Sequence, residues 1–317
     1  MPRALGIDIG GTKVLGVVVD TGAPGRVLAE HRVPTPRGTV AVVDAVAEVA
    51  DALGAVAGPD AAVGMGIPGL VDREDRFRYG PNLPDVLDVS LGDVLGERLS
   101  RRVVADNDAT CATFAEFRAG AGRGHADGVL VTLGTGIGGG IVVDGRLRHG
   151  ANGFAGEMGH MVVDPRGPRC PCGRRGCWER FGSGSGLGRL GRDAAAAGRL
   201  EQAVALAGGD AEAVRGEHVV AAARVGDPDA GEVLDEFAWW VALGVANVID
   251  LLDPSVVVLG GGVIEAADVL LDRIADAVPA QVLAADHRPA VAVVAAELGE
   301  HAGAIGAALL TAGDDVT

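Results

Sequence analysis

Aromatic residues, lysines and long apolar runs are scarce in this chain of 317 residues. Aromatic residues make up 3% of the chain, and Lys13 is the only lysine among 27 basic residues. The formal net charge is −16, so the surface repels a polyphosphate backbone and nucleic-acid binding is not expected. Asp, Gly or Pro interrupts every apolar run before the roughly 18 residues that a membrane span needs.

The start of the chain lacks the features of an export signal. The first nine residues contain no cationic stretch followed by an apolar core and a cleavage site. We therefore expect a cytoplasmic protein with no membrane partner. Three of the four cysteines are clustered at 170, 172 and 177, and Cys111 stands alone. In a reducing compartment such a cluster predicts metal ligands rather than disulfides.

The order of apolar segments indicates two similar α/β halves. A strand at 4–9, a glycine turn and a strand at 14–19 open the first half. A strand at 128–133, a glycine turn and a strand near 139–143 repeat this scheme. Because the chain is longer than one ordinary domain, the repetition predicts a duplicated α/β unit with a cleft between two lobes.

Periodicity and turn residues predict the remaining elements. Further strands are expected at 27–33, 62–67, 103–105, 256–259 and 291–295, and a hairpin at Asp144-Gly145. Helices are expected at 40–53, 94–99, from about 106, across 183–252 and at 302–310.

The first glycine turn, Gly10-Gly11-Thr12-Lys13, has the composition of a phosphate-binding loop. Glycines let the backbone approach a phosphate closely, Thr12 adds a hydroxyl and Lys13 a cation. Asp8, at the end of the preceding strand, is placed to hold Mg²⁺ directly or through water. The turn joins two strands, so it is not a Walker loop, and an ordinary tight hairpin is the alternative interpretation.

Two later glycine runs extend this pattern. Gly134-Thr135-Gly136 repeats the ingredients of the first turn in the second half, and a cleft between the two turns would hold a polyphosphate from both sides. Gly260-Gly261-Gly262 lies between a strand and an expected helix, which suits an adenosine site. A plain strand-to-helix turn is its alternative.

Asn107-Asp108 opens a helix directly after a strand. A kinase that acts on a hydroxyl needs a carboxylate to accept the proton, and Asp108 could be that base. The alternative is a helix N-cap, which Asp and Asn both favour.

One histidine and three cysteines form the strongest local signal. They match a complete tetrahedral zinc set, which describes a structural rather than a catalytic metal: His160, Cys170, Cys172 and Cys177. The metal would fix the segment of Glu157 near the loop of Glu179, and both carboxylates could accept hydrogen bonds from a polyol. Incidental thiols and solvated surface carboxylates are the alternatives.

These residues resemble the ROK family (repressors, open reading frames and sugar kinases). The resemblance is carried by His160 and the pattern Cys170-x-Cys172-Gly-x-x-Gly-Cys177-x-Glu179, together with the glycine turns and Asn107-Asp108. The resemblance covers essentially the whole chain. Within the family, the sequence looks most similar to actinobacterial hexose kinases, which act in carbohydrate metabolism and glycolysis. The first strand begins at residue 4, which leaves no room for the helix-turn-helix domain of repressor members and favours the kinase branch.

The resemblance implies a two-lobed actin-like ATPase (ribonuclease H-like) fold, with hexose and ATP in the cleft. Residues 1–107 plus 301–317 would form a small α/β domain, and 108–300 a large α/β domain with the zinc loop. Asp108 would be the catalytic base for transfer to O6 of the sugar, most simply glucose. Sugar contacts would come from Gly69, Asn107, Asp108, Glu157, His160 and Glu179. Phosphate, Mg²⁺ and nucleotide contacts would come from Asp8, Gly10, Gly11, Thr12, Lys13, Gly134, Thr135, Gly136, Gly261 and Gly262.

The resemblance also implies a homo-oligomer, either a dimer or a tetramer. Other readings stay open on the sequence alone. A kinase for fructose, mannose or an N-acetylhexosamine, a non-catalytic sugar-sensing regulator and a zinc module that binds a protein are the alternatives.

Overall fold

The computed structural model of this chain describes residues 3–80 and 90–313. Its first sheet has the strand order β3-β2-β1-β4-β7. The strands are β1 (Arg3–Ile9), β2 (Lys13–Asp20), β3 (Val27–Pro34), β4 (Val63–Ile67) and β7 (Val103–Asn107). The first three strands pair antiparallel, and β4 and β7 continue the sheet in parallel.

The second sheet repeats this order as β10-β9-β8-β11-β12. Its strands are β8 (Gly128–Leu133), β9 (Ile137–Val143), β10 (Arg146–Leu147), β11 (Val256–Gly260) and β12 (Ala292–Ala295). In each sheet the three strands that come first in the chain run in reverse order, and the two later strands of the sheet follow them. The repetition confirms the duplicated α/β unit that the glycine turns predicted.

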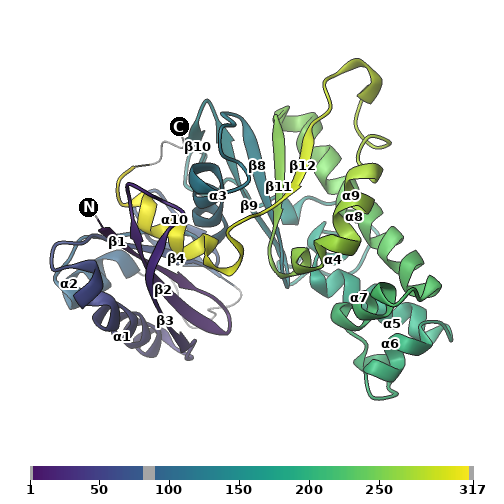
Figure 1. The fold of residues 1–317 in the computed structure, drawn as a ribbon, viewed down its shortest axis with the longest axis horizontal. Coiled ribbons are helices and arrows are strands. Elements are labelled where there is room, and N and C mark those ends of the chain that lie inside the picture. Colours follow the sequence, from purple (N-terminus) through teal and green to yellow (C-terminus); the bar gives the residue numbers. More distant parts are fainter. Residues whose placement is uncertain (1–2, 81–89, 314–317) are drawn as a thin grey trace. The chain divides into compact units, whose positions relative to one another are not determined.

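Alternation along β1 and β4 separates the two faces of the first sheet. Leu5, Ile7 and Ile9 belong to a buried apolar cluster with α1 (Thr39–Ala57) and α2 (Leu91–Leu99). Because successive side chains of a strand point to opposite faces, the intervening residues face the other way. Figure 1 shows α1 and α2 beside this sheet.

The opposite face of the first sheet packs against α10 (Ala302–Leu310), which in turn contacts α3 (Asp108–Ala119). Here helix and strand backbones meet directly. A Cβ on Gly64 of β4 would lie 1.6 Å from the carbonyl oxygen of Ala307. Only glycine permits this approach, so the last helix of the chain is fixed against its first strands.

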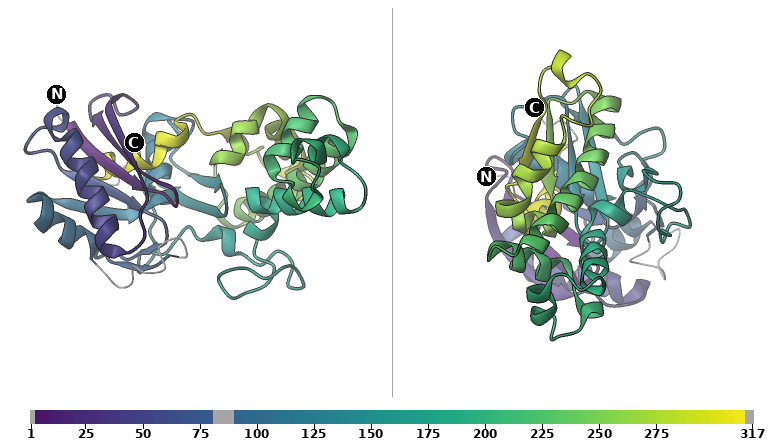
Figure 2. Two further views of the ribbon diagram at one scale, coloured as in Figure 1. Left: turned by 90° about the horizontal axis from the view of Figure 1, so that it is seen from below. Right: turned by 90° about the vertical axis from the view of Figure 1, so that its right-hand side faces the viewer.

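Six helices from the second half of the chain pack against one another, and Figures 1 and 2 draw them from teal-green to yellow-green. They are α4 (Glu179–Gly182), α5 (Gly184–Ala196), α6 (Glu201–Leu206), α7 (Gly216–Arg224), α8 (Pro228–Leu252) and α9 (Ala267–Ala277). Short 3-10 turns are η1 (Met158–His160), η2 (Ala211–Ala213), η3 (Gly262–Ala266), η4 (Ala285–His287) and η5 (Gly299–His301).

The chain divides into two compact units. The first comprises residues 1–130, 139–156 and 296–317, and the second comprises 131–138 and 157–295. The domain boundaries expected from the sequence, after 107 and after 300, are a different division and stay a prediction.

Most predicted elements are present, with a few differences at short segments. The hairpin at Asp144-Gly145 is confirmed, since β9 pairs with β10 and both turn residues have positive φ. A small hairpin of β5 (Leu70–Val71) and β6 (Phe77–Tyr79) was not predicted, because strands of two or three residues carry no readable alternation. Within the described ranges, no helix is both long and apolar enough to cross a membrane.

Candidate functional site

Asp8 lies near the end of β1, on the sheet face that packs against α10 and α3. Glycines make room for its carboxylate. A Cβ on Gly303 of α10 would lie 2.8 Å from Asp8 Cγ. A Cβ on Gly66 of β4 would lie 3.3 Å from Asp8 Oδ1 and 3.4 Å from the Cα of Asp108. Asp8 and Asp108 therefore border the same glycine-lined space.

The carboxylate of Asp8 has an unusual electrostatic environment. Its Oδ1 is buried, and none of the residues at 3–80 and 90–313 forms a hydrogen bond with it. Burial, and then the neighbouring charge of Asp108, raise the pKa of Asp8 to about 7, and Lys13 acts in the opposite direction. A buried, unpaired carboxylate oxygen costs free energy unless a cation or donor reaches it, so this position fits a hard cation such as Mg²⁺.

The first glycine turn follows Asp8 and joins β1 to β2. Gly10 N–H donates to the carbonyl of Lys13 at 2.9 Å, while Gly11 and Thr12 are exposed. The Lys13 ammonium forms an ion pair with Glu300 of η5, and Arg32 on β3 pairs with the same carboxylate at 3.3 Å. The sequence did not signal Glu300 as a partner of this turn, because nearly the whole chain separates the two residues.

Asn107 and Asp108 stand where β7 ends and α3 begins. Asn107 is the N-cap: its Oδ1 accepts from Thr110 N–H at 2.9 Å, and its Nδ2 donates to the carbonyl of Gly69 at 3.0 Å. The N-cap interpretation is therefore correct for Asn107. Asp108 is the first helical residue, and its Oδ1 accepts from Ala109 N–H at 2.8 Å. Burial raises the pKa of Asp108 despite the hydrogen bonds that act against the shift.

In the second unit, the turn Gly134-Thr135-Gly136 joins β8 to β9. Its neighbour is Glu179, the first residue of α4, whose Oε2 would lie 2.7 Å from a Cβ on Gly136. The other oxygen, Oε1, lies 2.9 Å from the Sγ of Cys170. Glu179 thus connects the glycine turn to the cysteine cluster.

The four predicted metal ligands converge in the second unit, and their ligand atoms all lie within 4.8 Å of one another. The Sγ atoms of Cys172 and Cys177 are 3.6 Å apart, and Cys170 Sγ is 3.8 Å from His160 Nδ1. Two sulfurs on a tetrahedral zinc, each about 2.3 Å from the metal, lie about 3.8 Å apart. These residues therefore fit a closed, four-coordinate zinc site.

The local backbone explains how one short loop brings the three cysteines together. Arg169 and Arg175 form an antiparallel bridge, and Cys170 N–H donates to the carbonyl of Arg174 at 2.8 Å. Burial acts against ionisation of Cys172, but hydrogen bonds from Arg174 and the neighbouring thiols lower its pKa to about 6. A thiolate of this kind is the form that binds metal.

The second ring nitrogen of His160 turns toward a carboxylate. His160 Nε2 lies 3.8 Å from Oε2 of Glu157, the N-cap residue of η1. His160 can therefore bind the metal through Nδ1 and a polar ligand through Nε2, beside Glu157.

The third glycine run follows β11. Gly261 has a φ of 83°, and Gly262 begins η3, with no atom within 4 Å of where its Cβ would be. That bare backbone agrees with the close approach expected of a nucleotide site.

The structure thus assembles the predicted residues in two groups. The first unit contains Asp8, the first glycine turn, Gly69, Asn107 and Asp108. The second unit contains the second glycine turn, the metal ligands, Glu157, Glu179 and Gly261-Gly262.

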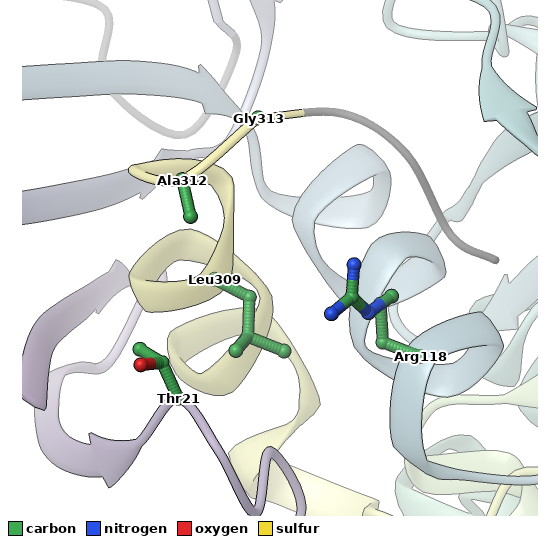
Figure 3. Close-up of a pocket in the computed structure, with 5 residues that line it drawn as sticks. All are labelled: Thr21, Arg118, Leu309, Ala312 and Gly313. Carbon is green, nitrogen blue, oxygen red and sulfur yellow. The ribbon is translucent and has the colours of Figure 1, made fainter. Parts of the chain in front are cut away.

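A separate cavity of about 80 Å³ in the first unit is lined by Thr21, Arg118, Leu309, Ala312 and Gly313 (Figure 3). Sites for small-molecule ligands occupy roughly 300–1,000 Å³, and this cavity contains no predicted residue, so it is not the substrate site.

Comparison of the sequence with known proteins identifies the family of this chain. A model of the ROK family matches residues 4–313. The chain is 39% identical over 312 residues to a glucokinase of Streptomyces coelicolor, with 97% of each protein covered. It is 35% identical over 315 residues to an N-acetylmannosamine kinase of Escherichia coli O157:H7, with 98% of each covered.

Comparison with a solved structure leads to the same family. The ROK family glucokinase from Streptomyces griseus, in complex with glucose and AMPPNP, superposes with a TM-score of 0.87 at 39% identity, covering 97% of this chain and 98% of that one. The fold is therefore that of the two-domain, actin-like sugar kinases. Within that class, the chain belongs to the ROK family.

We predict that Asp8→Asn stabilises the protein in buffer without divalent cations. The folded-state pKa of about 7 exceeds the ordinary 3.8, so the folded protein holds this proton more tightly than the unfolded chain. Wild-type stability then falls as the pH rises between these values, by at most about 1.4 kcal/mol per pH unit. Asparagine has no charge to bury, so the variant should melt above the wild type at pH 8, with a smaller difference at pH 5.5.

Thermal unfolding at the two pH values measures this effect. Asp193→Asn is the matched control, because Asp193 pairs at the surface with Arg189 at 3.0 Å. That variant should not melt above the wild type at pH 8. A wild type at least as stable as Asp8→Asn at pH 8 would show that Asp8 carries no burial cost.

Proposed function

We propose that this protein transfers the terminal phosphate of ATP to O6 of a hexose, and that the hexose is glucose. The observation that carries the proposal is the partly buried carboxylate of Asp108, which borders the same glycine-lined space as Asp8. Support also comes from the similarity, over nearly the full chain, to a glucokinase and to a glucokinase structure that contains glucose and AMPPNP.

In this proposal Asp108 is the general base. Burial raises its pKa, which makes the carboxylate a better acceptor for the proton of the attacking hydroxyl. The hydrogen bond from Ala109 N–H to Oδ1 helps to fix the carboxylate, and in this proposal Oδ2 would accept the proton of the sugar hydroxyl. The proton moves to Asp108 as the phosphoryl group reaches the oxygen in line.

Asp8 and the glycine turns would serve the nucleotide. The unpaired Oδ1 of Asp8 is the protein atom that fits Mg²⁺, directly or through water. Bound Mg²⁺ would neutralise charge that develops on the transferring phosphoryl group. N–H groups of the turns at 10–13 and 134–136 would bind phosphate oxygens, and Gly261-Gly262 would line the adenosine site.

The sugar would be held by acceptors and donors that suit hydroxyl groups. We assign this role to Gly69, Asn107, Glu157, His160 and Glu179. The side chain of Asn107 is held between Gly69 and Thr110, which fixes its amide beside Asp108. His160 and Glu179 both contact Cys170, so a metal at the cysteine cluster would orient two sugar ligands at once.

Zinc at His160, Cys170, Cys172 and Cys177 would be structural. All four positions are protein atoms, which leaves none open for substrate. We further propose a cytoplasmic protein, because thiols of this cluster need a reducing compartment, and a homo-oligomer, on the resemblance to the family alone.

A coupled assay of ADP release over a panel of sugars tests the function and its alternatives. We expect glucose to give the highest kcat/KM, above fructose, mannose, N-acetylglucosamine and N-acetylmannosamine. The similarity to an N-acetylmannosamine kinase makes that sugar the most informative competitor. ADP release with none of these sugars would contradict the proposal and favour a sugar-sensing regulator.

The second test concerns Asp108→Asn. Asparagine keeps the shape and the hydrogen bond at Oδ1 but cannot accept a proton, so glucose affinity should persist while kcat falls about 10²–10⁴-fold. Glucose titration calorimetry and steady-state kinetics separate the two effects. Asp51→Asn, an exposed change on α1, should keep wild-type kcat. Near-normal turnover of Asp108→Asn would remove this residue from the mechanism.

The third test concerns the metal. Elemental analysis should find about one zinc per chain, and Cys172→Ala should lose it and bind glucose more weakly, because structural zinc contributes folding free energy. Cys111→Ala is the control, since this thiol is buried outside the cluster. It should retain full zinc content. Fully active protein without zinc would refute a structural metal.

A further inference from the structure

The two glycine turns are anchored in the same way, although they lie in different units. In the first turn, the carbonyl of Gly10 accepts from the hydroxyl of Thr35 at 2.6 Å. The N–H of Thr35 donates to the carbonyl of Thr12 at 3.1 Å. Thr35 directly follows β3, the strand that pairs with β2, so one residue holds two carbonyls of the turn.

The second turn is anchored by the first residues of α5. Ser185 Oγ donates to the carbonyl of Thr135 at 2.7 Å. The N–H of Gly184 donates to the carbonyl of Gly134 at 2.8 Å. One hydroxyl and one backbone N–H again hold two carbonyls, although the anchoring segment here is a helix and not a strand.

This anchoring decides which backbone groups remain for a ligand. Within the described chain, the N–H groups of Gly11, Thr12, Thr135 and Gly136 donate to no protein acceptor, whereas carbonyls of both turns are occupied. Glycine lets a peptide unit rotate at little steric cost, so an untethered turn could present its carbonyl oxygens instead. A carbonyl oxygen repels phosphate, whereas adjacent N–H groups form a concavity that binds it.

We propose that Thr35 and Ser185 are positioning residues for nucleotide binding: their hydroxyls hold the turn carbonyls aside, so that the turn N–H groups stay directed to the phosphates. The proposal rests on the ATP-dependent function above. Neither residue would touch the sugar or the reacting atoms. Sequence reasoning missed both, since a single Thr or Ser next to an ordinary turn gives no signal.

Thr35→Val and Ser185→Ala remove the hydroxyls with little change in shape. Each variant should bind Mg²⁺–AMPPNP about five-fold or more weakly, the factor for one hydrogen bond of about 1 kcal/mol. KM for ATP should rise likewise, with glucose affinity and zinc content unchanged. Alanine is a better helix former than serine, which offsets part of the lost hydrogen bond, so Ser185→Ala should melt close to the wild type. Loss of nucleotide affinity without loss of stability is a result that a merely structural role would not produce.

Conservative variants and a distant hydroxyl complete the design. Thr35→Ser and Ser185→Thr retain the donor and should restore most of the affinity, which also keeps the test decisive if Thr35→Val folds poorly. Thr311→Val removes a hydroxyl bond of similar length, 2.8 Å to the carbonyl of Ala308, outside both turns. It should bind AMPPNP as the wild type does.

The outcomes separate this proposal from the proposed function. A wild type that phosphorylates glucose, with Thr35→Val and Ser185→Ala variants that bind Mg²⁺–AMPPNP normally, would overturn the positioning role and leave the kinase intact. A wild type that binds no AMPPNP would overturn both. Equal losses of nucleotide and glucose affinity, not restored by Thr35→Ser or Ser185→Thr, would indicate general damage and also refute the proposal.

Discussion

The close contact between α10 and the first two parallel strands is the constraint on which the candidate site depends. Glycines at 6 and 64 bring the strands against the helix backbone, and a Cβ on either would lie within 2 Å of a helix carbonyl oxygen. This packing places Gly303 on the Asp8 carboxylate, and Gly66 leaves space beside Asp108. The last helix of the chain therefore helps to define a site whose carboxylates come from the first half.

A second consequence is electrostatic. Burial raises the pKa of both aspartates, and the neighbouring charge of Asp108 raises that of Asp8 further. Asp8 in particular has a buried oxygen that receives no hydrogen bond from the part of the chain that the structure describes. Burying such a carboxylate lowers the stability of the folded protein. Carboxylates with strongly shifted pKa values are typical of functional sites, where they bind a ligand or take part in catalysis.

Duplication gave the two halves the same strand order but not the same surroundings. The first glycine turn borders a hydroxyl at the end of a strand, and the second borders a hydroxyl at the start of a helix. Similar hydrogen bonds at two unrelated neighbours indicate that the turns need a fixed peptide orientation, whatever segment supplies it. The second half adds a metal-type cluster, which Glu179 joins to its turn.

Local patterns in the sequence determined much of this protein by themselves. The cysteine spacing, with one histidine ten residues before it, specifies a metal-type cluster because all four ligands lie within eighteen residues, and the structure brings them together. The glycine turns, the duplicated strands and the family were readable for the same reason. Only the tertiary structure decided that Glu300 pairs with Lys13, that Asn107 caps a helix while holding Gly69, and that Thr35 and Ser185 anchor the turns. Those contacts join residues distant in the chain, and their chemistry depends on which side chains the packed sheets and helices bring within hydrogen-bonding distance, which no local pattern records.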